Sequence, residues 1–218
     1  PVELKHKMID WWGNIFYEYY SGSEGIGMTH ADPDQWLKFP GTVGKPLMGI
    51  IHICDDQGQQ VPPGEIGKIY FESDHEFNYH NDNKKREKVK HSHHSSWSSF
   101  GDIGYVNEEG YLFLTDRESF MIISGGVNIY PQEVENLLSM HEDVEDVAVI
   151  GIPDDDMGEQ VKAFIKLSKS AEDRSNQEQY FIEYTRSHLA NYKCPKSISF
   201  VDDLPRSDAG KLVKRYLK

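Results

Sequence analysis

Two adjacent glycines near the middle of the chain limit most strictly what it can fold into. Residues 120–123 form an apolar run typical of a strand, Ser124-Gly125-Gly126 follows, and a helix opened by a proline begins near Pro131. Paired glycines at such a junction allow a tight turn or a close approach of backbone to a ligand. We therefore interpret residues 115–133 as a hinge and a substrate-facing loop that join two lobes sharing one site.

The composition is that of a folded, acidic protein. The chain has 218 residues, of which 38% are hydrophobic and 12% aromatic, and this is enough for one large domain or two modest ones. The net charge is -13, and both halves carry more acids than bases, which argues against a nucleic-acid surface. No apolar run approaches the roughly 18 residues that span a bilayer, and no signal peptide opens the chain. We expect no transmembrane segment and a cytoplasmic location.

The cysteines, the first residue and a cluster of histidines each lead to a further expectation. Cys54 and Cys194 have neither metal-ligand nor disulfide-framework spacing, and we expect two reduced thiols. Pro1 is not an initiator methionine, and an amphipathic run begins at once, which predicts a fragment of a longer protein. The histidines of residues 91–94 lack a carboxylate or cysteine at ligand spacing, so a loop is favoured there over a metal site.

Short strands and Gly/Pro turns dominate the first half, and a mixture of helices and strands follows. The pattern of the first half is typical of a small barrel or sandwich, and that of the second half is typical of a compact α+β lobe. The expected helices are residues 4–12, 78–90, 131–140, 176–190 and 210–218. The expected strands are 14–20 (buried), 41–46, 49–54, 67–72, the hairpin 101–106 with 110–114, then 120–123, 144–152, 160–167 and 197–201.

Three local patterns point to chemistry. In Tyr20-Ser21-Gly22-Ser23-Glu24-Gly25, a hydroxyl and bare N–H groups suit a phosphate oxygen, a carboxylate suits Mg²⁺, and an aromatic ring suits a base. The alternative is an ordinary turn, and the GxxxxGK[ST] pattern is absent. If the hairpin strands pair, Asp102 approaches Asp116-Arg117, where a carboxylate suits ribose hydroxyls and an arginine suits phosphate. The alternative is a surface ion pair.

The third pattern is the loop of residues 204–211, which ends at Lys211. Proline and glycine define the loop, and the expected helix from residue 210 would present Lys211 at its start. A lysine on such a loop can supply a cation to a polyanion. The alternative is an exposed lysine in a solvated tail.

Taken in order, these segments resemble the second half of the adenylate-forming (AMP-binding) acyl-CoA synthetases. The resemblance runs from about Tyr17 to Lys214 and rests on five ordered signatures, YYSGSEG, GTVGKP, GDIGY, TDRESFMIISGGVNIYPQEVE and LPRSDAGK. Within the superfamily, ISGGVNIYPQEVE looks most like fatty-acyl or aryl-acyl CoA ligases. The resemblance implies that residues 1–116 end a large adenylation domain, with its last nucleotide-binding strand and turn and a distorted β-barrel. Residues 117–218 would form a small, mobile α+β domain.

The resemblance also implies a role for each site residue. In the first part, Tyr20 would pack on adenine, Ser23 would contact phosphate and Glu24 would hold Mg²⁺. Asp102 would bind the ribose hydroxyls, and Arg117 would reach the ribose–phosphate region.

The roles implied for the second part concern movement and thioester formation. Ser119 falls at the hinge position, and Lys211 would be the adenylation lysine. Gly125 and Gly126 would line the pantetheine tunnel.

Some features depart from the family pattern. Ser21 replaces a glycine and Ser23 a threonine of the usual turn, and Phe100 stands where a threonine often precedes Gly-Asp. The loss of that hydroxyl puts one nucleotide contact in doubt. The phosphate loop and the acyl-binding walls of the family would lie upstream of Pro1.

The expected function follows from the resemblance. The chain would be the carboxyl-terminal portion of an ATP-dependent acid–thiol ligase that makes acyl-CoA from a fatty or aryl acid, ATP and coenzyme A through an acyl-adenylate. By itself it would be catalytically silent or nearly so, because it lacks the N-terminal part of the same enzyme. Two alternatives stay open: a carrier-protein-loading adenylation domain, and a non-catalytic binding or regulatory module on the same scaffold.

Overall fold

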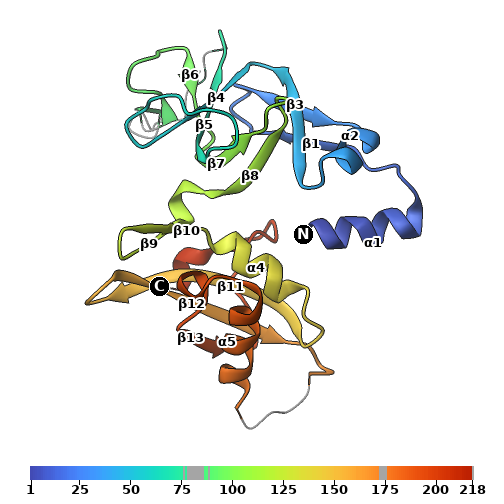
Figure 1. Cartoon of the computed structure of the whole chain (residues 1–218), viewed down its shortest axis with the longest axis vertical. Helices are drawn as coiled ribbons and strands as arrows, with labels where there is room; N and C mark the ends of the chain where they lie inside the picture. The colour runs from blue at the N-terminus through green and yellow to red at the C-terminus, as the bar shows by residue number, and fades with distance from the viewer. Residues whose placement is uncertain (76, 78–85, 88, 172–175, 218) are drawn as a thin grey trace. The chain divides into compact units, whose positions relative to one another are not determined.

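The computed structural model describes residues 1–75, 77, 86, 87, 89–171 and 176–217. The chain divides into two compact units, Pro1–Ser119 and Phe120–Lys218 (Figure 1). Compactness alone does not make a unit an independently folding domain, so the domains expected at residues 1–116 and 117–218 stay a prediction. Within the described residues, no helix has the length and apolar character needed to cross a bilayer.

The first unit is built on an eight-stranded antiparallel sheet. Its strands follow the order β1-β2-β3-β8-β7-β5-β4, and β6 pairs with β5. This order does not show a closed barrel, which stays a prediction. The helices of the unit are α1 (Val2–Trp12) and α2 (Pro33–Lys38). The strands are β1 (Glu18–Ser21), β2 (Met28–Ala31), β3 (Thr42–Met48), β4 (Ile50–Cys54), β5 (Gly67–Glu72), β6 (Trp97–Ser98), β7 (Asp102–Val106) and β8 (Leu112–Arg117).

The core of the first unit lies on β4, β5 and β8. Ile53, Ile69, Phe71 and Leu112 are buried there in one apolar cluster. A Cβ atom at Gly27 would lie 2.1 Å from the Phe71 ring, so only glycine fits beside this ring. The strands expected at 41–46, 49–54 and 67–72, and the 101–114 hairpin, are confirmed by β3, β4, β5, β7 and β8.

The buried strand expected at residues 14–20 is wrong in both extent and burial. Only Glu18–Ser21 is a strand, and the side chain of Tyr19 is 66% exposed. The reason is that successive side chains of β1 point to opposite faces of the sheet, and those on the face of Tyr19 are exposed. The helix expected at 78–90 lies largely outside the described residues; Arg86, Glu87 and Val89 are helical.

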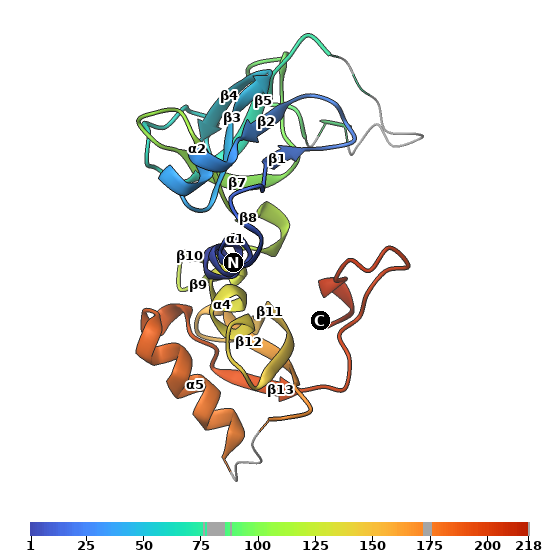
Figure 2. The same cartoon turned by 90° about the vertical axis from the view of Figure 1, so that its right-hand side faces the viewer.

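The second unit is a five-stranded sheet with two helices packed on it. The strand order is β10-β9-β12-β11, and β13 pairs in parallel with β12. Figure 2 shows helices α4 and α5 beside these strands. Residues of both helices share one apolar cluster with the strands. The bounds are β9 (Ile122–Ser124), β10 (Val127–Ile129), α4 (Pro131–Ser139), β11 (Val144–Asp154), β12 (Gly158–Leu167), α5 (Gln177–His188) and β13 (Ser197–Phe200). The mixed α+β class is confirmed, as are the helices and strands expected from residue 131 to residue 201.

Two expectations for the second unit are wrong. The terminal helix expected at 210–218 is replaced by a turn, in which Arg206 bridges Leu212, and by a 3-10 helix at Lys214–Tyr216. Gly210 has a φ of +76° that closes this turn and that a right-handed helix does not allow. The strand expected at 120–123 begins later, at Ile122, because Phe120 ends a 3-10 helix (Glu118–Phe120).

Candidate functional site

The turn that follows β1 is closed by its own backbone and by one hydroxyl. Gly25 N donates a hydrogen bond to Gly22 O at 3.1 Å, and Ser21 Oγ donates to Gly27 O at 3.0 Å. Ser21, which departs from the family pattern, therefore has a structural role in this turn. Gly25 has a φ of +67°, a conformation that favours glycine.

Phe100 packs beneath the same turn. A Cβ atom at Gly22 would lie 2.4 Å from Phe100 Cε1, so the ring occupies the space that a side chain at 22 would need. The ring also meets Tyr20 edge-on, with centroids 5.5 Å apart. Phe100 thus supplies packing at the position where the family often has a hydroxyl. Sequence reasoning missed this contact, because it joins segments about eighty residues apart.

Asp102, Arg117 and Tyr20 converge at one end of the sheet. Asp102 on β7 is directly opposite Arg117 on β8, which confirms that the paired hairpin brings them together. Arg117 Nε lies 3.4 Å from Asp102 Oδ1, and Tyr20 Oη donates a hydrogen bond of 2.6 Å to Asp102 Oδ2. The Asp102 side chain is only 12% exposed, whereas the Arg117 side chain is 63% exposed.

Burial controls the ionisation of this cluster. It raises the pKa of the Tyr20 hydroxyl above its ordinary value, and the Asp102 carboxylate raises it further. Burial also raises the pKa of Asp102, while the hydrogen bond from Tyr20 and the charge of Arg117 oppose that rise. Tyr20 therefore stays a protonated donor at neutral pH. A carboxylate held in this way can accept hydrogen bonds from a pair of vicinal hydroxyls.

Ser23 and Glu24 supply oxygen atoms next to this cluster. Ser23 Oγ donates a hydrogen bond to Glu24 Oε2 at 3.3 Å. Across the residues that the structure describes, no three histidine, cysteine or acidic side chains are grouped to hold a metal. One carboxylate with a neighbouring hydroxyl fits Mg²⁺, which takes one or two carboxylates and completes its shell with phosphate oxygens and water.

Lys211 lies in the second unit on an exposed turn rather than at a helix start. Ser207 N donates to Lys211 O at 2.8 Å, and Gly210 N donates to Ser207 O at 2.8 Å. Arg206 forms an ion pair with Asp146 at the base of the turn. The side chain of Lys211 is exposed.

Gly125 and Gly126 form the turn between β9 and β10, and not a direct connection to the helix. Their φ values are +58° and +78°. Gly125 N donates to Met157 O at 2.8 Å, and a Cβ at Gly125 would lie 2.4 Å from Met157 Cε. A Cβ at Gly126 would meet no atom within 4 Å. Ser119, the expected hinge, is exposed in the 3-10 helix that ends the first unit.

A buried ion pair near Lys211 was also missed. Lys214 Nζ lies 2.7 Å from Glu135 Oε1, and both side chains are buried. One signal was present in the sequence: Glu135 shares a stripe at i, i+3, i+4 and i+7 with Pro131, Val134 and Leu138, which are all buried. An acid on such a stripe requires a buried partner.

The chain matches the C-terminal portion of acyl-CoA ligases of the AMP-binding enzyme family. Residues 133–211 match the model for the AMP-binding enzyme C-terminal domain.

Two relatives from Bacillus subtilis strain 168 match the whole chain. It is 36% identical over 220 residues to a long-chain-fatty-acid–CoA ligase, covering 100% of this chain and 38% of the relative. It is 34% identical over 220 residues to an uncharacterized acyl–CoA ligase, covering 100% of this chain and 43% of the relative. The chain thus spans less than half the length of these relatives.

A solved structure agrees with these matches. The O-succinylbenzoate coenzyme A synthetase of Bacillus subtilis, in complex with ATP and magnesium ion, superposes with a TM-score of 0.82 at 32% identity. The superposition covers 100% of this chain and 44% of that protein.

Proposed function

We propose that this chain is the C-terminal portion of an ATP-dependent carboxylic acid–CoA ligase that acts through an acyl-adenylate. The observation that carries the proposal is the buried Asp102 carboxylate beside the Ser/Gly turn. It accepts a hydrogen bond from Tyr20 Oη at 2.6 Å and forms an ion pair with Arg117. This arrangement suits the ribose hydroxyls of ATP. By itself the chain would have little or no ligase activity, because its relatives are more than twice as long.

In the first half-reaction, the acid's carboxylate attacks the α-phosphorus of ATP, and pyrophosphate leaves. Asp102 would hold the ribose, and Arg117 would contact the ribose–phosphate region. Lys211 would place its ammonium against the carboxylate and α-phosphate oxygens, where negative charges approach one another in the transition state. Ser23 would contact phosphate, and Glu24 would hold Mg²⁺, which supplies charge neutralisation on the phosphates when bound.

In the second half-reaction, the coenzyme A thiolate attacks the acyl-adenylate. Lys211 has no role in this step. We propose that the second unit turns about Ser119, so that Lys211 leaves the site and the turn at Gly125 and Gly126 enters it. The absence of side chains at these glycines gives the narrow pantetheine chain room to pass the backbone.

The two alternatives predict different outcomes. A carrier-protein-loading domain would form the adenylate and transfer the acyl group to a carrier-protein thiol, not to coenzyme A. A non-catalytic module would bind nucleotide and activate no acid. The presence together of Glu24, Asp102, Arg117 and Lys211 favours the enzyme.

A hybrid ligase tests the proposal. This chain replaces the matched C-terminal portion of the Bacillus subtilis long-chain-fatty-acid–CoA ligase, and acid-dependent exchange between ATP and labelled pyrophosphate is measured with a panel of fatty and aryl acids. We expect exchange, followed by thioester formation with coenzyme A. A folded hybrid that exchanges with no acid supports the binding module, and one that exchanges but acylates only carrier protein supports the loading domain.

A second measurement needs only the chain itself. AMP binding is followed by calorimetry for the natural chain, for Asp102→Asn and for Asp56→Asn, which removes a carboxylate from an exposed turn. We expect Asp102→Asn to weaken binding by about tenfold or more, because a charged acceptor is lost, and Asp56→Asn to leave it unchanged. Equal affinity for all three chains would contradict the assignment of Asp102.

A further inference from the structure

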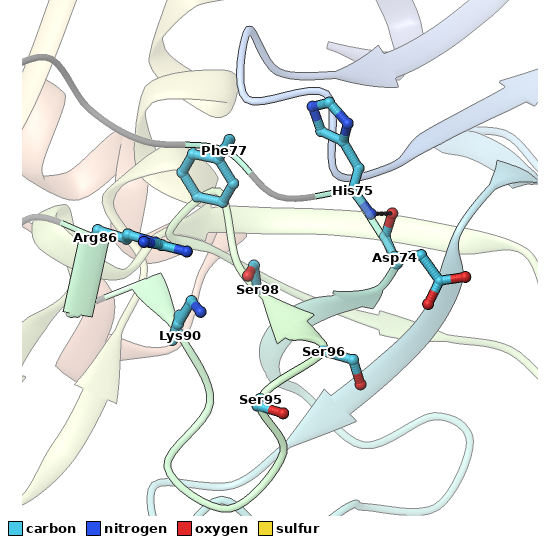
Figure 3. Close-up of a pocket in the computed structure, with 9 residues that line it drawn as sticks. Asp74, His75, Phe77, Arg86, Lys90, Ser95, Ser96 and Ser98 are labelled. Atoms are coloured by element: carbon cyan, nitrogen blue, oxygen red, sulfur yellow. Dashed lines mark hydrogen bonds between the residues drawn. The ribbon is translucent and has the colours of Figure 1, made fainter.

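A cationic cavity lies beside the Ser/Gly turn of the first unit. Its volume is about 250 Å³, and Phe77, Arg86, Lys90 and Ser98 are among the residues that line it (Figure 3). His75 also lines it, and His75 Nε2 lies 3.4 Å from the position that a Cβ would take at Gly25. The cavity is therefore a neighbour of the turn, but its lining shares no residue with the proposed ATP-binding set.

Two basic side chains face this cavity without ion-pair partners among the described residues. Arg86 Nε is buried and has no hydrogen-bond partner in the described part of the chain. Figure 3 shows Arg86 and Lys90 on the same side of the cavity, next to Ser98 and below the Phe77 ring. A buried donor without a partner is costly, and an anion in the cavity would satisfy it.

The main chain fixes the wall that holds these groups. Lys90 forms a backbone bridge with Ser98, and Ser98 on β6 pairs with Phe71 on β5. Ser99 N donates a hydrogen bond to Val89 O at 2.8 Å. Ser98 is only 7% exposed. The backbone positions of Lys90 and Ser98 are therefore set by the main chain before any ligand arrives.

The charge of the pocket contrasts with the rest of the protein. The chain has a net charge of -13. Three other lysines of the first unit, Lys5, Lys38 and Lys68, are paired with carboxylates. Asp74 also lines the cavity, but Figure 3 shows its carboxylate directed away from Arg86. A guanidinium, an ammonium and a hydroxyl together suit a tetrahedral oxyanion.

We propose that the cavity defined by Arg86, Lys90 and Ser98 binds inorganic phosphate or pyrophosphate. Its volume is below the roughly 300–1,000 Å³ of pockets for drug-sized ligands, so it suits a small anion better than a whole nucleotide. Arg86 and Lys90 supply the charge, and Ser98 Oγ donates a hydrogen bond to the anion. This site does not depend on the proposed ligase activity, because none of its residues belongs to that machinery.

Calorimetry on the 218-residue chain tests the proposal. Phosphate, pyrophosphate and adenosine 3′,5′-bisphosphate are titrated at constant ionic strength without Mg²⁺. We expect pyrophosphate or phosphate to bind, and Arg86→Gln to weaken binding by about tenfold, as expected for a lost charged hydrogen bond. Arg86→Lys, which keeps the charge, should weaken binding less. Lys7→Gln removes the same charge from the exposed side of α1 and is the matched control that should change nothing.

Lys90→Gln is a second variant, used with Arg86→Gln after circular dichroism has verified that each chain is folded. Weaker binding in either folded variant supports the site. The proposal is overturned if no inorganic anion binds, or if folded Arg86→Gln and Lys90→Gln bind as well as Lys7→Gln. It is also overturned if adenosine 3′,5′-bisphosphate binds more than tenfold tighter than pyrophosphate, because the site would then belong to a nucleotide phosphate.

Discussion

Lys214 and Glu135 form a buried ion pair, with Nζ and Oε1 2.7 Å apart and side chains 7% and 9% exposed. Glu135 Oε1 also accepts a hydrogen bond from Val149 N at 2.6 Å. The Lys214 ammonium lies 4.7 Å from the centre of the Phe120 ring. The Glu135 carboxylate of α4 thus contacts both β11 and the C-terminal segment. The contact in that segment is Lys214, three residues after Lys211.

Lys214→Ala is expected to destabilise the second unit by about 3–5 kcal/mol, because it leaves the Glu135 carboxylate buried without its counter-charge. Guanidinium unfolding followed by far-UV circular dichroism measures this loss. All four tryptophans lie in the first unit, so tryptophan fluorescence reports on that unit and should change little.

The matched control for this prediction is a second lysine whose partner lies on the same helix as Glu135. Lys193 pairs with Glu133 of α4 at 2.7 Å, but these side chains are 25% and 41% exposed. Lys193→Ala should therefore cost at most about 1 kcal/mol. An equal loss of unfolding free energy in both lysine variants would contradict the prediction, because it would show that burial does not make the Lys214 pair more important for stability than the exposed pair.

Asp102→Asn is expected to change how the stability of the first unit depends on pH. Because burial raises the folded-state pKa above the ordinary 3.8, the folded state binds the proton more tightly than the unfolded state. The stabilising contribution is complete below the unfolded pKa and is lost as the pH rises through the folded pKa. Tryptophan-monitored unfolding from about pH 3 to about pH 7 should show this loss in the natural chain. Asp102→Asn should remove it, and Asp56→Asn should retain it.

His91 is expected to make the first unit sensitive to acid. Its Nδ1 accepts hydrogen bonds from His93 N and His94 N, so its Nε2 carries the proton and donates to Gly58 O at 2.9 Å. A second proton would have to bind Nδ1, where it would be repelled by the two backbone N–H groups that donate to that atom. Burial lowers the pKa of His91 below its ordinary 6.5, and the neighbouring histidines lower it further.

The sign of the His91 effect is opposite to that of Asp102. The stabilisation is present above the unfolded pKa of 6.5 and is lost as the pH falls through the lower folded pKa. His91→Gln should show less additional loss of unfolding free energy on acidification than the natural chain does, as measured by tryptophan fluorescence. His75→Gln, at an exposed histidine elsewhere in the first unit, is the control. An unchanged acid response in His91→Gln would contradict the assignment.

Lys211→Ala in the hybrid ligase is expected to slow adenylation by about 100-fold or more, because a cation aimed at the transition state is removed. Thioester formation from preformed acyl-adenylate should be largely unchanged. Pyrophosphate exchange measures the first step, and thioester release from added acyl-adenylate measures the second. Lys169→Ala, which removes another exposed lysine of the second unit, should affect neither. Equal losses in both steps would contradict the alternating role of Lys211.

Gly126→Ala in the hybrid is expected to slow thioester formation more than adenylation. Its φ of +78° costs an alanine about 1–2 kcal/mol of stability. Gly64→Ala is the matched control, since Gly64 has a φ of +88° and also has no atom within 4 Å of its Cβ position. It should cost similar stability and leave both steps intact. If both variants slow thioester formation alike, backbone strain rather than the tunnel explains the loss.

Parts of the candidate site could be predicted because they depend on local pairing. Asp102 and Arg117 are joined by a short hairpin, so once its strands were recognised their approach followed. The hydrogen bond from Tyr20 to Asp102 spans 82 positions, and no local pattern indicates it. The packing of Phe100 against Gly22 requires the folded sheet, so the sequence indicates only that a hydroxyl is missing at this position.

The sequence alone determined where most strands and helices lie, since alternation, apolar stripes, glycines and an initial proline act over a few residues. It also placed the paired glycines at a turn. Tertiary structure decided which strand lies at the edge of the sheet and that the segment after Gly126 pairs with β9 as strand β10. It also decided that Lys214 is buried in an ion pair with Glu135. These outcomes depend on contacts between distant segments, whose burial and charge pairing exist only once the chain has folded.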